Sequence, residues 1–362
     1  MNKEIVNSGR QKELDWAKAF TIIAMICSHV YEQISVVDTS TVPTGAFRLI
    51  LEFSVGPLGA PLFMFCMGVG IMYSPKSTPV QMVKRGVLLL RNGYLLSFVK
   101  GTIPTAIAIY LGFAVPWSLA DSFFLVSILQ FAGMAFFTIA LMKKLNFSLP
   151  AMLITSLVLS VLGGQLAKFD FTDSWVQYLF GLFFNTNDVT TFPLLRWLFY
   201  PVFGMIFAYF LQRVEDKGRF YGIMFPIALI CTLAFGFIYS AAGMDLRNMF
   251  MLSGRVFYHQ SLLHHLYATF VILTALPIYY WLSVKVNISI ISGVVSYLAR
   301  NLDVIYLVQW VIIIYAQSFM IMLGVSNLTI PYIIPVGVLV LLLSIGFIEL
   351  VRLIKRAKKS RI

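Results

Sequence analysis

The stretch VIYLVQWVIIIYAQSFMIMLGVSNLTIPYIIPVGVLVLLLSIGFI, Val304–Ile348, contains no charged residue and is long enough to cross a lipid bilayer twice. Its GVSN segment, Gly324–Asn327, supplies a turn between the two crossings. Other uncharged windows have about the 20 residues needed to span a hydrocarbon core roughly 30 Å thick. They are Phe53–Pro75, Ser122–Met142, Leu145–Ala167, Phe220–Met244 and Leu266–Val284. Because only a self-satisfied backbone spans lipid and these segments are too long for barrel strands, the sequence predicts an all-α, polytopic transmembrane helical bundle.

The composition of the 362-residue chain agrees with a membrane protein, since 59% of the residues are hydrophobic and only 12% are charged. The charged share is about half of that in ordinary soluble domains. The net charge of +12 comes from basic residues that gather at alternate helix ends, which is the positive-inside pattern and not a nucleic-acid-binding surface. We therefore predict a multi-pass protein of the cell membrane that contacts membrane lipids and no nucleic acid. The three cysteines lie in apolar spans as small hydrophobes, so no disulfide and no metal site is predicted.

With both termini cytoplasmic, about ten spans satisfy the charge rule throughout. We place them near 16–37, 47–74, 83–115, 119–142, 146–167, 192–212, 220–243, 262–284, 302–323 and 329–353. The third is too long for one straight crossing and is predicted to be a bent helix, or a helix with a re-entrant piece, broken at GTIP, Gly101–Pro104. The predicted organisation is a cytoplasmic head (1–14), one transmembrane domain (15–355) and a basic cytoplasmic tail (356–362).

The first predicted span carries an ionisable stripe. At about 100° per residue, Asp15, Lys18, His29 and Glu32 share one helix face, and Lys18 and His29 are roughly 16 Å apart along the axis. Ionisable groups in a bilayer cost at least roughly 2.5–3.5 kcal/mol, so they face the bundle interior or a water-filled cavity. Histidine exchanges protons near neutral pH. We therefore predict a solvated channel from the cytoplasmic cations to His29 as acid or base; the alternative is that Glu32 pairs with Arg48 and His29 bonds a backbone carbonyl.

Six segments, in order along the chain, carry a family resemblance. They are ELDWAKAFTIIAMICSH (Glu13–His29), PLFMFCMGVGIMYS (Pro61–Ser74), VKRGVLLL (Val83–Leu90), SILQ (Ser127–Gln130), FPLLRWLFYPVFGMIFAYF (Phe192–Phe210) and SYLARNLDVIYLVQW (Ser296–Trp310). Together they resemble the integral-membrane acyltransferases of the acyltransferase-3 superfamily. The fourth and fifth segments are similar to its heparan-α-glucosaminide N-acetyltransferase-like branch. In the first segment, Lys18 stands where the family usually has arginine.

The resemblance implies a ten-helix enzyme that takes an acyl group, most simply acetyl, from cytoplasmic acyl-coenzyme A. The acceptor is a hydroxyl or amine of a sugar-containing molecule at the outer face, and no metal is required. His29 carries over as the catalytic residue, as a base or as a nucleophile, with Glu32 beside it. The sequence leaves open the acceptor, the acyl chain, the choice between these two mechanisms and the oligomeric state, a homo-oligomer included.

Coenzyme A carries several phosphate charges, so cations near the cytoplasmic face are candidates for binding it. They are Lys18, Lys84, Arg85 and Arg91. Simple positive-inside anchoring is the alternative for Lys84 and Arg85. Lys100 is a weaker candidate because the break after it would let it reach the interface.

Candidates for binding the acceptor are polar or aromatic side chains at the outer side or within spans. They are Arg48, Gln130, Arg196, Trp197 and His259. Each has a simpler alternative: an ion pair for Arg48, helix–helix hydrogen bonding for Gln130, interfacial anchoring for Arg196 and Trp197, and ordinary interfacial polarity for His259. Near the ninth span, Asp303 and Gln309 are either caps and packing contacts or part of the coenzyme entrance.

Two other functions compete with acyl transfer. In a proton-coupled secondary transporter, His29, Glu32, Arg48 and Arg91 would form a relay at the midplane. Such transporters often have paired broken helices in internal repeats, and the chain has one plausible break without a matching second. A non-catalytic membrane assembly factor is the third possibility, and it leaves the ionisable stripe unexplained.

Overall fold

A computed structural model describes residues 4–169, 171, 173–186, 190–252, 257–286 and 288–359. Parts of the predicted head (1–3) and tail (360–362) therefore lie outside the described residues. The regular elements of the described chain are helices, and the β-structure in it consists of isolated bridges that join Ser35 to Leu328 and Val126 to Thr190. This confirms the predicted all-α class.

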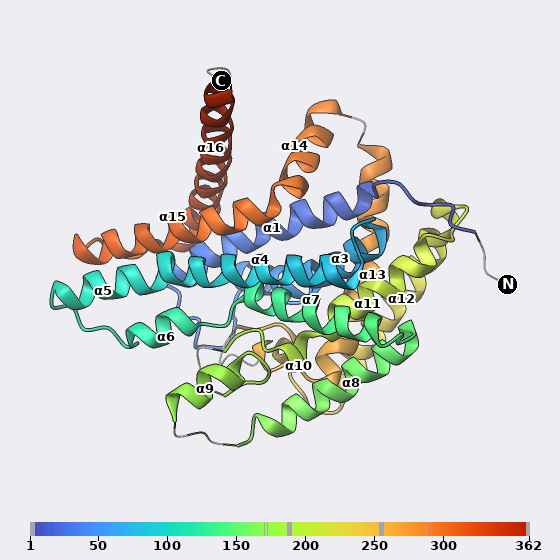
Figure 1. Ribbon diagram of the computed structural model, residues 1–362, viewed down its shortest axis with the longest axis horizontal. Helices are drawn as coiled ribbons and strands as arrows, with labels where there is room; N and C mark the ends of the chain where they lie inside the picture. The colour runs from blue at the N-terminus through green and yellow to red at the C-terminus, as the bar shows by residue number, and fades with distance from the viewer. Residues whose placement is uncertain are drawn as a thin grey trace.

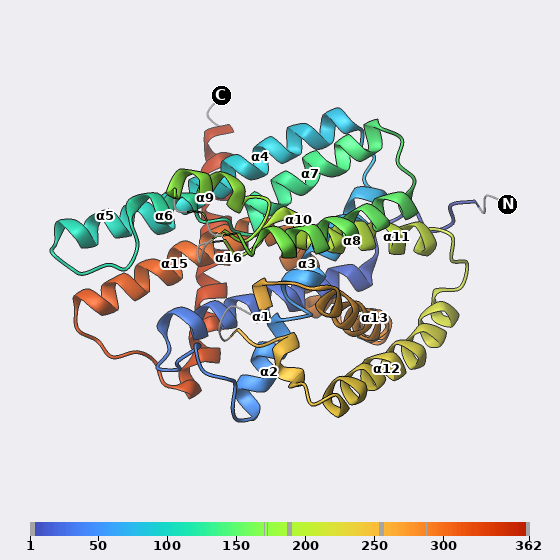
Figure 2. The same cartoon turned by 90° about the horizontal axis from the view of Figure 1, so that it is seen from below.

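Helix α1 (Lys12–Ile34) is the central element (Figure 1). It packs against α2 (Ala46–Val55), α3 (Ala60–Tyr73), α13 (Leu262–Lys285), α14 (Ser289–Arg300), α15 (Leu302–Met322) and α16 (Ile333–Lys359). In both Figure 1 and Figure 2, α16 stands at a steep angle to α15. The remaining helices include α8 (Leu149–Leu166), α9 (Ser174–Gly181), α10 (Leu194–Trp197), α11 (Phe199–Leu211) and α12 (Lys217–Ala241), which lies beside α13.

Seven helices in the described residues are long and apolar enough to cross a membrane. They are Ala46–Tyr73, Leu149–Leu166, Leu194–Leu211, Lys217–Ala241, Leu262–Lys285, Leu302–Met322 and Ile330–Lys358. The other three predicted spans fall on α1, on the rod that begins with α4 (Pro79–Ser97), and on α7 (Ile128–Lys144). Polar and charged side chains interrupt α1 and α4, and α7 is shorter than 18 residues.

Several of these helices expose long apolar faces. On α12 the exposed side chains include Ile223, Ile227, Ile230, Leu233 and Phe237, and a similar row follows α16. A soluble domain rarely exposes apolar surface over such lengths. In lipid these faces need no cover, so their exposure agrees with a membrane protein.

The predicted break in the third span is a π-helical turn, Phe98–Thr102, between α4 and α5 (Ile103–Tyr110). Pro104 has no N–H to donate to the Lys100 carbonyl, so the regular hydrogen-bond pattern is interrupted there. The Ile103 N–H reaches back to the Phe98 carbonyl instead, which widens the turn. The chain continues as one helical rod, as predicted, but Lys100 is buried and does not reach the interface.

The predicted span 119–142 is wrong at its start. Residues Leu119–Phe124 form a separate short helix, α6, and α7 begins only at Ile128. Ser127 starts α7, because its backbone N–H and its hydroxyl both donate to Gln130 Oε1, at 3.2 and 2.5 Å. The Gln130 side chain thus binds the residue that starts the helix, a contact that apolar composition alone does not reveal.

Helices α3 and α11 approach so closely that glycine is required on both. A Cβ at Gly68 would lie 1.9 Å from the Pro201 carbonyl oxygen, and one at Gly204 would lie 2.1 Å from the Phe65 carbonyl oxygen. We expect Gly68→Ala to lower the free energy of unfolding by about 1–3 kcal/mol, because the backbones must separate. Thermal unfolding of the purified protein measures this, and Gly70→Ala on the same helix is the control, since no atom lies within 4 Å of its Cβ position. Equal stability of the two variants would contradict the close packing.

Candidate functional site

A cavity of about 630 Å³ opens where α1, α3, α4 and α7 meet the junction of α14 and α15. The cationic side chains in its described lining are Lys18, Lys76, Lys84, Arg85 and Arg300, whereas Asp303 contributes a carboxylate. The rest is largely apolar and includes Phe63, Met67, Leu88, Leu129 and Phe136. A cationic rim over apolar walls suits a ligand that has anionic groups and a less polar part.

Three of the four residues predicted to bind the coenzyme meet in this cavity, namely Lys18, Lys84 and Arg85. Arg91 does not join them. It is exposed two turns further along α4, and its guanidinium donates to Asn92 Oδ1 at 3.2 Å. A second cavity of about 250 Å³ shares Lys18 and Arg300 with the first, and Gly9–Gln11 of the head are among its lining residues.

His29 lies further along α1 and contacts α15. Both amide atoms of Gln309 lie near His29 Nδ1, Oε1 at 3.1 Å and Nε2 at 3.0 Å. Gln309 Nε2 also donates one of its two hydrogens to the Tyr306 carbonyl at 3.2 Å, so the contact with Nδ1 fits either tautomer of the neutral His29 ring. In the tautomer whose Nδ1–H donates to Gln309 Oε1, the lone pair on Nε2 is available as a base.

Aromatic rings and a cation surround His29. Its ring lies on the Trp310 indole with 3.9 Å between centroids, and Tyr306 meets it edge-on at 6.4 Å. On the same indole, the Lys100 ammonium lies 3.6 Å from the ring centroid. Tyr306 and Trp310 belong to the late sequence segment Ser296–Trp310. The fold thus brings the ends of the first and last family-like segments together at His29.

Sequence analysis did not assign Gln309, Trp310 or Lys100 to the His29 site. Gln309 was expected near the cytoplasmic end of its span and Lys100 near the interface. A usable signal was present, because a fully buried amide within an apolar helix requires a hydrogen-bonding partner. Only the packing of α1 on α15 shows that this partner is His29.

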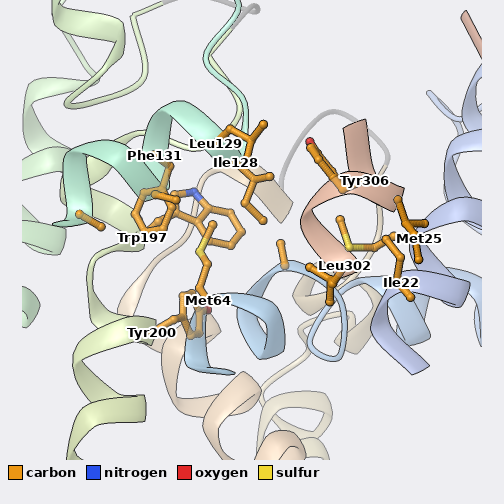
Figure 3. Packing of buried hydrophobic residues seen from close by; sticks show 14 of the residues in the cluster. Ile22, Met25, Met64, Ile128, Leu129, Phe131, Trp197, Tyr200, Leu302 and Tyr306 are labelled. Carbon is orange, nitrogen blue, oxygen red and sulfur yellow. The ribbon is translucent and has the colours of Figure 1, made fainter. Parts of the chain in front are cut away.

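The cavity that holds the predicted cations does not include the end of the predicted channel, because His29 is not among its described lining residues. Ile22 and Met25 of α1 pack beside Leu302 and Tyr306 of α15 (Figure 3), and all four are buried. These apolar side chains occupy the helix face between Lys18 and His29, because α1 packs closely on α15 along this length.

Glu32 does not pair with Arg48, so that alternative is wrong. Ser28 Oγ donates to Glu32 Oε1 at 2.7 Å, and the Glu32 carboxylate interacts electrostatically with Lys100. Arg48 instead forms a buried ion pair with Glu52, with 3.0 Å between Nη2 and Oε1. The sequence analysis overlooked Glu52.

Arg48 and Gln130, two of the predicted acceptor ligands, have their polar groups bound within the protein. The Arg48 guanidinium also donates to the side-chain and backbone oxygens of Thr41, both at 3.0 Å. Gln130 is fully buried, and its Nε2 donates to Ser97 Oγ and to the Leu125 carbonyl, both at 3.1 Å. In this structure both side chains join helices to loops or to other helices. This agrees with the alternatives stated above, an ion pair for Arg48 and helix–helix hydrogen bonding for Gln130.

Two further predicted acceptor ligands, Arg196 and Trp197, lie inside the bundle. Trp197 is fully buried in the aromatic core between Phe192 and Phe257, with no face open to a saccharide. Arg196 is buried as well, and its Nη1 donates to the Gln260 carbonyl at 3.0 Å. The short helix α10 is folded into the bundle, so neither residue is an interfacial anchor.

His259 is exposed, whereas the two histidines that follow it in the sequence are buried. His264 Nδ1 bonds Ser261 Oγ at 2.8 Å at the start of α13, and His265 Nε2 bonds Ser160 Oγ at 2.8 Å. Of the five predicted acceptor ligands, His259 is thus the one whose side chain reaches the surface.

Comparison with known proteins identifies the family. The sequence profile described as an acyltransferase domain matches residues 11–349, which is nearly the whole chain. No curated protein and no solved structure matches the chain. The match does not distinguish the heparan-α-glucosaminide N-acetyltransferase-like branch, and nothing supports the transporter alternative. The chain belongs to the acyltransferase-3 family of membrane acyltransferases.

Proposed function

We propose that this protein transfers an acyl group, most simply acetyl, from acyl-coenzyme A to a hydroxyl or amine of a sugar-containing acceptor. The donor enters from the cytoplasm and the acceptor from the outer face of the cell membrane. The proposed topology has ten spans and both termini in the cytoplasm, which satisfies the distribution of basic residues. The spans form one transmembrane domain (15–355) between a short head and a basic tail.

The observation that carries this proposal is the cationic cavity beside α1, the helix that also bears His29. Lys18, Lys84 and Arg85 supply charges for the phosphates, and the apolar walls suit the less polar parts of the donor. Lys18 and His29 lie on one unbroken helix, roughly 16 Å apart along its axis. The extended arm of the coenzyme has to cover this distance for the thioester to reach His29. To do so, the arm displaces the apolar contacts of Ile22 and Met25.

The chemistry at His29 is general-base catalysis. A thioester is already activated, so the enzyme mainly has to take a proton from the attacking hydroxyl or amine. Gln309 holds His29 Nδ1, and Nε2 faces the acceptor and takes that proton. Glu32, one turn further along α1, orients the acceptor or the imidazole. Arg91 has no part in this proposal, and His259 is retained as a contact for the acceptor at the surface.

We expect the double variant Lys84→Gln/Arg85→Gln to bind acetyl-coenzyme A about 10-fold more weakly than the wild type. Each exposed charge contact contributes up to about 1 kcal/mol, and about 1.4 kcal/mol corresponds to a factor of ten in Kd. Isothermal titration of the purified full chain measures this. The difference should shrink at high salt, because salt screens exposed charges.

Lys144→Gln is the matched control, since Lys144 is an exposed cation at the end of α7 and is not among the residues that line the cavity. It should bind as the wild type does. An unchanged Kd in the double variant would exclude this cavity as the donor site. Absence of acetyl-coenzyme A binding to the wild type would exclude the donor itself.

A further inference from the structure

Lys100 is a buried cation in the interior of the bundle. Lys100 is 8% exposed and lies in the π-helical turn that joins α4 to α5. An ionisable group at this depth costs at least roughly 2.5–3.5 kcal/mol, and such groups face the bundle interior or a cavity. A leucine or methionine at this position would be buried without that cost in free energy.

Helix α15 holds this turn at two points. Tyr315 Oη donates to the Val99 carbonyl at 3.2 Å, and the Lys100 ammonium lies over the Trp310 ring, 3.6 Å from its centroid. The π turn rotates the side chain of Lys100 relative to a regular helix, and α15 then fixes its direction. Lys100 is therefore directed at α15, and a snorkelling lysine would instead extend towards the interface.

The same stretch of α15 carries the partners of His29. Trp310 contacts both the His29 ring and the Lys100 ammonium, and Gln309 bonds His29 Nδ1. Lys100 also attracts the Glu32 carboxylate, one turn beyond His29 on α1. Two helical elements far apart in the sequence thus place His29 and Lys100 against the same indole.

We propose that Lys100 is a second catalytic residue, whose ammonium stabilises the negative charge that forms on the thioester carbonyl oxygen during acyl transfer. The inference rests on the proposed function. A base and a fixed cation within reach of one reacting carbonyl is the arrangement that acyl transfer needs, because charge develops on the oxygen as the bond to the acceptor forms.

The step balances as follows. The acceptor oxygen forms a bond to the thioester carbon, its proton goes to His29 Nε2, and the carbonyl π electrons move to the oxygen beside Lys100. The oxyanion then re-forms the C=O bond, the C–S bond breaks, and the coenzyme thiolate takes the proton from His29. The products are the acylated acceptor and free coenzyme A, and Lys100 keeps its protons throughout.

The test compares Lys100→Met with the wild type in hydrolysis of acetyl-coenzyme A, where water replaces the unidentified acceptor and released thiol is measured. We expect kcat to fall about 100-fold, as when one donor to an oxyanion is removed, with little change in the Kd for acetyl-coenzyme A. Lys100→Arg keeps the charge and should retain more activity than the methionine variant. Lys285→Met, an exposed lysine at the end of α13, is the control and should behave as the wild type does.

Methionine fills nearly the same volume without a charge, so the thermal midpoint of Lys100→Met should not fall. A kcat equal to that of the wild type would overturn the role of Lys100, as would a loss confined to donor binding. A Lys100→Arg variant no more active than Lys100→Met would also count against it. If the wild type itself releases no thiol, the proposed function fails, and this outcome is distinct from a failure at Lys100.

Discussion

Replacement of His29 by alanine is expected to lower acetyl-coenzyme A turnover by about 10²- to 10⁴-fold, the range over which a positioned general base contributes. Gln309 and Trp310 fix the position of the imidazole ring, so the substitution removes a base that is already positioned for proton transfer. The donor cavity does not include His29, and the Kd for acetyl-coenzyme A should stay within about 3-fold of the wild type. Steady-state kinetics and titration of the same preparation separate the two quantities.

Ile23→Ala on the same helix is the control for His29→Ala. Ile23 is 42% exposed and lies outside both cavities, so truncation should leave turnover and folding nearly unchanged. Turnover by a folded His29→Ala protein at the wild-type rate would remove His29 from the mechanism. A loss that appears equally in Ile23→Ala would indicate that α1 tolerates no truncation.

Replacement of Glu52 by alanine is expected to lower the free energy of unfolding by about 3–5 kcal/mol, the cost of leaving a buried charge without its partner. The Glu52 carboxylate is fully buried and accepts hydrogen bonds from three parts of the chain. Arg48 donates at 3.0 Å, Tyr31 Oη at 2.8 Å and the Leu252 N–H at 3.0 Å. The variant therefore unpairs Arg48 and also releases the loop at Leu252 from α1 and α2.

Thermal unfolding in detergent, with the wild type measured alongside, checks this expectation. Glu215→Ala is the matched control, because Glu215 is exposed and surface changes usually stay within about 0.5 kcal/mol. A loss below about 1 kcal/mol in Glu52→Ala would mean that the network contributes little to holding these segments. Acetyl-coenzyme A binding by the surviving folded fraction should persist, since Glu52 is not among the residues that line the donor cavity.

The sequence predicted which cations gather at the candidate site, but not the direction in which each side chain points. The grouping of Lys18, Lys84 and Arg85 follows from the rule that basic residues gather at one membrane face, and the structure places all three around one cavity. Arg91 obeys the same rule, yet it is exposed away from that cavity, because its direction depends on how α4 is turned against α7. Charge and depth along a helix are readable from sequence, whereas direction depends on the neighbouring helix.

The buried polar residues show the same division. The sequence marked His29 and Gln130 as side chains that need partners, but the alternative that it left open for Glu32 was a pair with Arg48, whose partner is Glu52. Trp197 was expected at an interface because tryptophan often lies there, and it is in the aromatic core instead. Such errors arise because the helices of an apolar chain resemble one another in sequence, so the sequence does not reveal which of them pack together.

The sequence by itself determined the helical class, the positions of most long helices and the alignment of Lys18, His29 and Glu32 on one face. These are local properties, because a backbone in lipid must satisfy its hydrogen bonds within its own helix. Only the tertiary structure decided that Gln309 and Trp310 contact His29, that Lys100 lies over the same indole, and that Ile22 and Met25 pack against α15 between Lys18 and His29. Those contacts join residues up to 281 positions apart, as for His29 and Trp310. Side-chain packing between helices selects them, and a hydropathy pattern does not reveal it.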